Sequence, residues 1–173
     1  YLAQEHFPYS PRFLGIDAHN REILTYFPGK VPRETPLNLQ QQIAAVRILR
    51  QLHDLLAKSP LRGGQETICH NDFAPWNLIV TDSEVIGVID FDEAAPGNRI
   101  DDLAYCLWTL LDYGNNTASK DAQIEDIIAL IQAYGVEFAL GFKNATLAQQ
   151  RRILTYREAV VNQGNNPQMR EFS

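Results

Sequence analysis

Apolar residues recur at intervals of three and four in several parts of the chain, the spacing that gives a helix one buried face. The longest such stretch runs from Leu39 to Leu56. Asn38 precedes it as a candidate N-cap, and Gln41 follows three residues later, a pair typical of a capping box. The pattern therefore predicts a helix that ends before Pro60.

Three further helices are predicted from the same periodicity in the second half of the chain. We expect them over residues 103–111, 124–134 and 147–161. Polar caps and glycines next to each stretch indicate where it begins or ends. The expected boundary residues are Asp101 or Asp102 with Gly114 for the first helix, Gly135 for the second, and residues 164–167 for the third.

Two shorter regions predict β-hairpins, because runs of apolar, extended-type residues flank polar turns. The first hairpin pairs residues 12–15 with 22–27, and the second pairs 78–80 with 85–89. Residues 30–36 contain two prolines and are typical of a linker.

The order of these elements predicts an α+β chain with two unequal parts. Residues 1–30 would form a short β piece, and residues 31–173 a mainly helical domain with one embedded hairpin. The 173 residues are 45% hydrophobic and 21% charged, which is ordinary for a globular domain. Since the chain opens at Tyr1 without an initiator methionine, we expect that natural residues precede it.

The charge balance narrows the range of partners. Lys and Arg total 15 against 21 Asp and Glu, a net charge of −6. This argues against nucleic acid or an anionic membrane as the main partner, because both bind basic surfaces. The two cysteines, Cys69 and Cys106, lie among apolar residues without metal-binding spacing. They are typical of reduced core thiols in a cytoplasmic protein.

The second hairpin is expected to bring three polar side chains together. Its two open ends must lie side by side, because paired strands are only about 5 Å apart. One end carries Asp72 and Asn77, and the other carries Asp90. Carboxylates at this position need solvent, a ligand or a metal, because an unpaired buried charge costs several kcal/mol.

Phosphoryl transfer uses residues of these types at this spacing. Carboxylate and amide oxygens suit Mg²⁺, and a separate aspartate can accept the proton of an attacking hydroxyl. The interval from Asp72 to Asn77, followed by Asp90, matches the catalytic-loop template of kinases. Taken without Asp90, Asp72 and Asn77 are also explained as turn formers around Pro75.

Several short motifs follow one another in a fixed order within residues 11–112. They are the hinge-like Ile23 to Gly29, Leu52-His53, His70 to Asn77, Val88 to Asp92, Gly97, and Asp102-Leu103-Ala104. As an ordered set they resemble the aminoglycoside phosphotransferase and choline-kinase-like family, small-molecule kinases with a protein-kinase-like fold. The resemblance implies a largely helical C-terminal lobe containing the catalytic hairpin, with residues 1–30 as a remnant of the N-terminal sheet and the interlobe hinge.

The resemblance also implies a role for each matching position. Asp72 would be the catalytic base, while Asn77 and Asp90 would hold Mg²⁺. His70 would orient the catalytic loop, and Asp102 would hydrogen-bond the loop backbone while capping its helix.

Asn71 stands where the family usually has glycine. Asparagine tolerates a positive φ better than most residues, so we expect the loop to keep its conformation.

Two ligand sites are implied as well. The backbone of Leu24, Thr25 and Tyr26 would contact the adenine of ATP, with GTP as the alternative nucleotide. The acceptor would be the hydroxyl of a small, cationic molecule, for which the candidate binding residues are Asp92, Glu93 and Asp101.

Elements that clamp the ATP phosphates in kinases are missing from the sequence before the hinge. There is no Gly-rich loop and no strand lysine, since the first lysine is Lys30. We expect the C-terminal lobe of an enzyme; the alternatives are a non-catalytic binding module of the same fold and, third, a Mg²⁺-dependent hydrolase. Without an N-terminal lobe, apolar surface around residues 7–28 would be exposed and could pair with a second copy.

Overall fold

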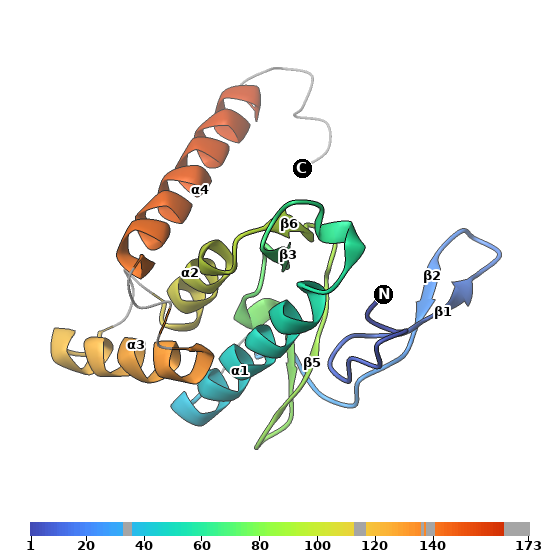
Figure 1. The fold of residues 1–173 in the computed structure, drawn as a ribbon, viewed down its shortest axis with the longest axis horizontal. Helices are drawn as coiled ribbons and strands as arrows, with labels where there is room; N and C mark the ends of the chain where they lie inside the picture. The colour runs from blue at the N-terminus through green and yellow to red at the C-terminus, as the bar shows by residue number, and fades with distance from the viewer. Residues whose placement is uncertain (33–35, 113–116, 136, 138–140, 165–173) are drawn as a thin grey trace.

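The computed structural model describes residues 1–32, 36–112, 117–135, 137 and 141–164. Helices form one side of the molecule, and short hairpins with long connections form the other (Figure 1). The elements in chain order are β1 (Phe13–Ile16), β2 (Glu22–Leu24), α1 (Leu39–Leu56), η1 (Pro60–Arg62), β3 (Thr67–Cys69), η2 (Pro75–Asn77), β4 (Leu78–Val80), β5 (Val85–Val88), β6 (Ala95–Gly97), α2 (Arg99–Leu110), α3 (Lys120–Tyr134) and α4 (Phe142–Gly164).

The strands form three separate antiparallel pairs, β1–β2, β3–β6 and β4–β5. Both predicted hairpins are present, although β2 ends at Leu24, before the expected residue 27. The pair between β3 and β6 was not predicted. Pro96 gives β6 the local signature of a turn, and the segment becomes a strand only through its pairing with Ile68, 28 positions earlier in the chain.

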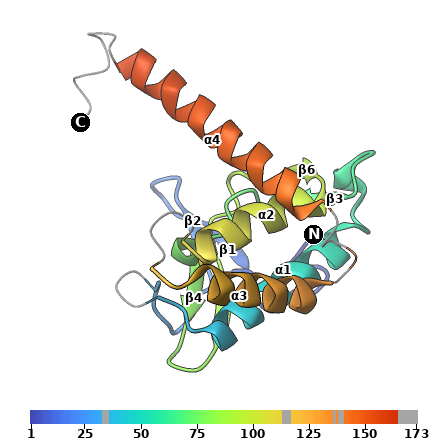
Figure 2. The same ribbon diagram turned by 90° about the vertical axis from the view of Figure 1, so that its left-hand side faces the viewer.

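The core lies between α1, α2, α3 and the inner faces of the β4–β5 hairpin. The apolar stripe predicted for α1 is largely buried, whereas its first residue, Leu39, is partly exposed. In Figure 2, α4 packs against α2 at its N-terminal end and extends well beyond the body of the molecule. The fully buried large apolar side chains are Leu49, Leu52, Phe73, Leu78, Leu103, Leu107 and Leu130.

Local capping signals explain α1 well. The Asn38 side chain accepts a hydrogen bond from the Gln41 backbone, and the Gln41 side chain accepts one from the Asn38 backbone, which completes the predicted capping box. The helix ends at Leu56, before Pro60, as the sequence indicates.

The predicted start of α2 is wrong. Its N-cap is Asn98, so Asp101 and Asp102 lie in the first helical turn and neither is the cap. The physical reason is that the first turn is held from outside the helix: the backbone N–H of Arg99 donates to the Glu66 side chain. The expected stop at Gly114 lies outside the described residues, and α2 already ends at Leu110.

The last two helices are longer than their periodicity indicates. Ser119 caps α3, which begins at Lys120, four residues before the expected start at 124, and Gly135, with φ +151°, closes it as predicted. Helix α4 extends the expected 147–161 at both ends, and the breaker beyond Gly164 lies outside the described residues. None of the helices described combines the length and apolar character needed to cross a bilayer.

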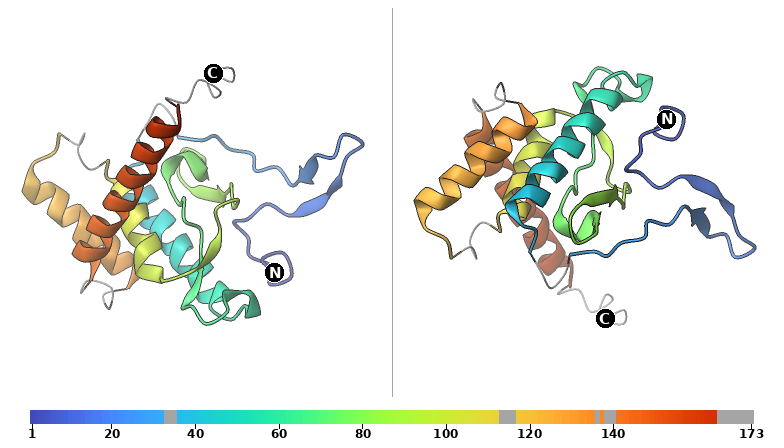
Figure 3. Two further views of the ribbon diagram at one scale, coloured as in Figure 1. Left: turned by 90° about the horizontal axis from the view of Figure 1, so that it is seen from above. Right: turned by 90° about the horizontal axis from the view of Figure 1, so that it is seen from below.

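The β1–β2 hairpin stands away from the rest of the molecule in both views of Figure 3. Its apolar side chains, including Phe13, Leu14, Ile16 and Ile23, are exposed, as expected for this region, although Phe7 nearby is buried. The polypeptide returns to the body at the β4–β5 hairpin.

Contact at the β4–β5 hairpin is close. The backbones of Lys30 and Val80 exchange two hydrogen bonds of 2.9 Å, and the Phe27 ring lies against Gly87.

Replacement of Gly87 by alanine should loosen this contact. An added Cβ would lie 2.7 Å from the Phe27 ring, so ring or strand must shift, and we expect a loss of about 1–3 kcal/mol in the free energy of unfolding. Urea unfolding measures it. The matched control is Gly64→Ala, where a Cβ meets nothing within 4 Å. Equal stability of the two variants would contradict the contact.

Candidate functional site

Two backbone positions near the β4–β5 hairpin have left-handed conformations that side chains rarely adopt. Asn71 has φ +65° and Asp90 has φ +64°. The positive φ of Asn71 confirms the expectation that the loop keeps its conformation with asparagine in place of glycine. Asp90 is an exposed residue two positions after the end of strand β5, and this φ turns the chain sharply at the mouth of the hairpin. Such strain of about 1–3 kcal/mol is typical of functional sites.

The Asp72 carboxylate is held by three hydrogen bonds. Its Oδ2 accepts from Asn77 Nδ2 at 2.7 Å and from Trp76 Nε1 at 3.2 Å. Its Oδ1 accepts from the Tyr105 hydroxyl at 2.6 Å. Asn77 Nδ2 also donates to the Asp72 backbone carbonyl at 2.9 Å. The loop therefore presents an oriented carboxylate just before the short 3₁₀ turn η2.

The hairpin joins Asn77 to the strand end that carries Asp90. Leu78 pairs with Val88, and the backbone N–H of Ile89 donates to the Asn77 carbonyl at 3.0 Å. Since Asp90 follows Ile89 directly, the fold brings the loop of Asp72 and Asn77 to the same place as Asp90. This juxtaposition is the one that the hairpin pattern predicts.

His70 connects the same two segments from the buried side. Its ring, 1% exposed, donates through Nε2 to the Ile89 carbonyl at 3.1 Å, and its Nδ1 accepts from the Asp72 backbone at 3.3 Å. Burial lowers the pKa of His70 below its ordinary value, although the carboxylates of Asp102, Asp72 and Asp90 oppose this. A neutral ring fits its roles as one donor and one acceptor.

Asp102 fixes the beginning of the loop. Its Oδ2 accepts from the His70 backbone at 2.7 Å and from His53 Nε2 at 2.9 Å, and its Oδ1 accepts from the Asn71 backbone at 2.9 Å. Burial by itself raises the pKa of Asp102, but the His53 hydrogen bond and the backbone donors outweigh it, so the pKa lies below its usual value. The loop contact expected for Asp102 is thus present, whereas its capping role is not.

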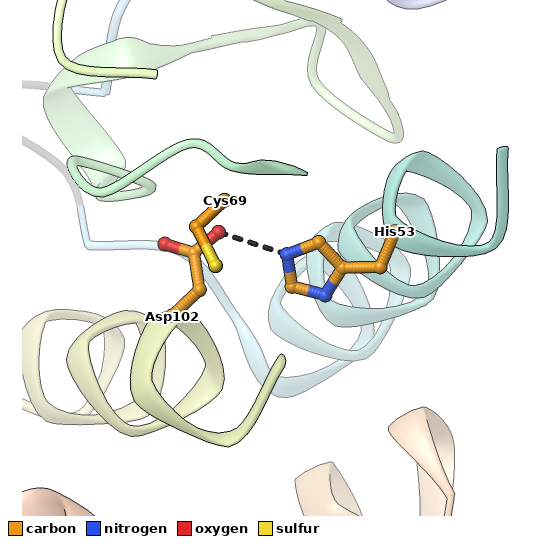
Figure 4. A group of neighbouring side chains, drawn as sticks. All are labelled: His53, Cys69 and Asp102. Atoms are coloured by element: carbon orange, nitrogen blue, oxygen red, sulfur yellow. Dashed lines mark hydrogen bonds and ion pairs between the residues drawn. The ribbon is translucent and has the colours of Figure 1, made fainter. Parts of the chain in front are cut away.

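Figure 4 shows His53, Cys69 and Asp102 meeting between α1, β3 and α2, with ligand atoms within 4.8 Å of one another. The spacing would suit a metal, but hydrogen bonds occupy the atoms: His53 Nδ1 accepts from the Tyr134 hydroxyl at 2.6 Å, and Cys69 Sγ donates to the Asn98 carbonyl at 3.3 Å. Burial and nearby carboxylates raise the pKa of Cys69, which keeps the sulfur a thiol. We interpret the group as structural.

The acidic residues expected to bind a cation lie on two segments. Asp92 and Glu93 are exposed in the turn that follows Asp90, and the Asn71 side chain donates to the Glu93 carbonyl at 2.8 Å. Asp101 is different, because its carboxylate accepts a hydrogen bond from Asn98 at 3.1 Å.

The expected nucleotide-contacting segment is only partly available. Thr25 pairs with Arg12 through both its backbone N–H and its hydroxyl, at 2.9 and 2.8 Å. Leu24 is half exposed at the end of β2, and the Tyr26 side chain is 82% exposed. A cavity of about 330 Å³ lined partly by Arg12, Thr25 and Phe27 adjoins this segment.

Two residues around Asp72 were missed from the sequence as members of the site. The residue type of Trp76 is typical of a packing residue, yet its side chain is 50% exposed and donates to Asp72. Tyr105 was not singled out. The available signal was its position three residues after Asp102, because residues i and i+3 of a helix lie on the same face.

Asp102→Asn should destabilise the protein by about 2–4 kcal/mol, because the amide cannot accept from all three donors and buried donors are then unsatisfied. Urea unfolding at pH 7 measures the change. Asp101→Asn, one position earlier on the exposed side, should stay within about 0.5 kcal/mol of the parent. Similar losses in the two variants would argue against an anchoring role for Asp102.

His70 should make stability depend on pH. Its folded pKa lies below the ordinary value of 6.5, so its contribution is complete above that pH and is lost as the pH falls, with a slope of up to about 1.4 kcal/mol per pH unit. Unfolding free energies between pH 7.5 and 5.5 should therefore decrease less steeply in His70→Gln. His19→Gln, an exposed control, should keep the parent slope; parallel curves for His70→Gln and the parent would contradict this.

Comparison with known proteins shows the family and the fold of the chain. The model of the phosphotransferase enzyme family (APH) matches residues 3–145. The trifolitoxin immunity protein of Rhizobium leguminosarum bv. trifolii is 30% identical over 108 residues, and the match covers 54% of this chain and 41% of that protein. The chain thus spans less than half the length of this relative.

Solved structures show the same fold at low identity. An aminoglycoside-3'-phosphotransferase of type VIII has a TM-score of 0.55 at 20% identity, covering 84% of this chain and 75% of its own. Aminoglycoside phosphotransferase APH(3'')-Id from Streptomyces rimosus has a TM-score of 0.54 at 17% identity, covering 84% and 77%. The expected kinase-like α+β fold is confirmed, and the chain belongs to the phosphotransferase enzyme family.

Proposed function

We propose that this chain carries the catalytic loop and metal site of an ATP- and Mg²⁺-dependent phosphotransferase whose acceptor is a hydroxyl of a small, cationic molecule. Asp72 is the catalytic base in this proposal, and Asn77 and Asp90 are the metal ligands. His70 and Asp102 position the loop. GTP is the alternative nucleotide.

One observation carries the proposal. Asp72 and Asn77 are hydrogen-bonded to each other at 2.7 Å, and the Ile89 N–H links Asn77 to the residue before Asp90. A base, an amide oxygen and a carboxylate thus lie at one mouth of a rigid hairpin, which is the set that phosphoryl transfer to an alcohol requires.

The donor set suits Mg²⁺. The Asn77 amide nitrogen donates to two oxygens of Asp72, so its carbonyl oxygen is directed elsewhere and can act as a ligand. Asp90 is an exposed carboxylate held in a strained conformation. Oxygen ligands of these types are those that Mg²⁺ prefers. When bound, the metal supplies neutralising charge for the nucleotide phosphates.

The chain's own residues would then perform the transfer. The Asp72 carboxylate accepts the proton of the acceptor hydroxyl, and its orientation is maintained by Asn77 and Trp76. Among Leu24, Thr25 and Tyr26, we propose the backbone of Tyr26 for the adenine contact, because the backbone N–H and the hydroxyl of Thr25 pair with Arg12. The adjoining cavity of about 330 Å³ supports a ligand at this segment.

The negative charge of the carboxylates beside the loop supports a cationic acceptor. Asp92 and Glu93 are exposed next to Asp90, and they are better placed for this role than Asp101, which is bonded to Asn98. The names of the structural relatives point to aminoglycosides, which are polycationic alcohols, as one such class.

The second candidate function is a non-catalytic module of the same fold. Residues 1–29 contain neither a lysine nor a Gly-rich loop, the two elements that clamp the ATP phosphates in kinases. A non-catalytic module that binds a nucleotide or a partner would need only the hinge and the hairpin.

Cytoplasmic placement and pairing with a second copy through the exposed β1–β2 hairpin remain part of the proposal.

Addition of Mg·ATP should raise the thermal midpoint of the protein. At a hundred times its dissociation constant, a ligand stabilises by about 2.7 kcal/mol, or several degrees for a chain of this size. Asp90→Ala should abolish the shift because the metal ligand is lost.

Asp82→Ala, an exposed acid at the opposite end of the same hairpin, is the matched control and should retain the shift. An unchanged shift in Asp90→Ala, or no shift in the parent, would contradict the nucleotide site. Mg·GTP in parallel identifies the preferred nucleotide.

A further inference from the structure

The two oxygens of the Asp72 carboxylate differ in the number of donors that they accept from. Oδ2 accepts two hydrogen bonds, from Trp76 and Asn77, which fills both of its lone-pair directions. Oδ1 accepts one, from the Tyr105 hydroxyl at 2.6 Å. The proton-accepting oxygen of this carboxylate is therefore Oδ1, and the group lying on it is itself an alcohol, the phenol of Tyr105.

Tyr105 is held in this position by the frame that also holds the loop. It lies one turn after Asp102 on α2, and the Asp102 carboxylate binds the backbones of His70 and Asn71. The Tyr105 and Trp108 rings are arranged edge to face, with their centroids 6.2 Å apart, which supports the phenol from the side. One helix face thus fixes both the start of the loop and the hydroxyl in contact with Asp72.

This contact meets the geometric condition for deprotonation. A general base must lie about 2.6–3.2 Å from the oxygen whose proton it accepts, and the Tyr105 hydroxyl is within that range. In the absence of an external acceptor, the phenol occupies the position that the acceptor hydroxyl would take on Oδ1.

We propose that Tyr105 is an internal acceptor, and that the protein phosphorylates itself on this hydroxyl when nucleotide is bound and no external alcohol is present. The inference rests on the proposed phosphotransferase function. It differs from a purely orienting role for Tyr105, in which the phenol donates to Asp72 and is never modified.

The step is balanced without any further reagent. The Tyr105 proton passes to Asp72 Oδ1 as the phenol oxygen forms a bond to the γ-phosphorus of ATP. The bond between that phosphorus and the β–γ bridging oxygen breaks, and ADP leaves with the electron pair. The product carries about −1.5 to −2 charges beside Asp72, which should repel a second nucleotide and block turnover. An external acceptor that takes Oδ1 would protect Tyr105.

The test uses the whole chain with Mg·ATP labelled in the γ-phosphate and no added alcohol. We expect label approaching one phosphoryl group per chain, located at Tyr105 by peptide mass mapping. Tyr105→Phe should lose it, and Asp72→Asn, which is nearly isosteric but cannot accept the proton, should reduce the rate about 100-fold or more. Tyr9→Phe removes another half-buried tyrosine hydroxyl and should label like the parent.

The possible failures are distinguishable. Thermal stabilisation by Mg·ATP without label at Tyr105 overturns this inference and leaves the proposed function standing. Label on another residue, or equal labelling of Asp72→Asn and the parent, overturns it as well. If Mg·ATP neither stabilises nor labels the protein, the proposed function fails and the inference fails with it. Because the site is mapped in the parent protein, the result does not depend on how the variants fold.

Discussion

The rest of the site depends on the hydrogen bonds that the buried carboxylate of Asp102 accepts. It is 1% exposed and accepts three hydrogen bonds, from His53 on α1 and from the backbones of His70 and Asn71 in the loop. A buried charge is tolerated only when donors surround it, so the helices and the loop must meet in one arrangement. Tyr134 extends this network to α3 through His53.

The loop connects this network to the β4–β5 hairpin. His70 reaches from the anchored start of the loop to the Ile89 carbonyl, while Asn77 at its other end accepts from the Ile89 N–H. Ile89, the residue before Asp90, is therefore bonded at its carbonyl by His70 and at its N–H by Asn77. This double attachment is a physical reason why Asp90 can keep a φ of +64°, since surrounding contacts must compensate for backbone strain.

Parts far from this network are less constrained. The β1–β2 hairpin carries exposed apolar side chains, and it is joined to the β4–β5 hairpin on both of its sides. The Val88 N–H donates to the Tyr9 carbonyl before β1, and Phe27, Gly29 and Lys30 make the contact after β2. A two-stranded hairpin is marginally stable alone in water, and additional surface would stabilise it. The candidate site is thus held by the helices and the β4–β5 hairpin, and among the residues that the structure describes no contact of the exposed β1–β2 strands is part of the network around Asp102.

The sequence by itself determined those features that neighbouring residues encode. The capping box of Asn38 and Gln41, the polar turn between β4 and β5, and the left-handed Asn71 all follow from local backbone and side-chain preferences. The hairpin then required Asn77 and Asp90 to approach each other, which is why most of the candidate site could be predicted from the sequence.

Only the tertiary structure decided the contacts between distant segments. Strand β6 forms because β3 offers a partner, α2 begins at Arg99 because Glu66 accepts from its backbone, and Tyr105 reaches Asp72 across 33 positions. Such contacts depend on how helices and strands pack, and packing uses the whole core at once. A local pattern carries no record of that packing, so the hydrogen bond from the Tyr105 phenol to the Asp72 carboxylate was visible only in the folded chain.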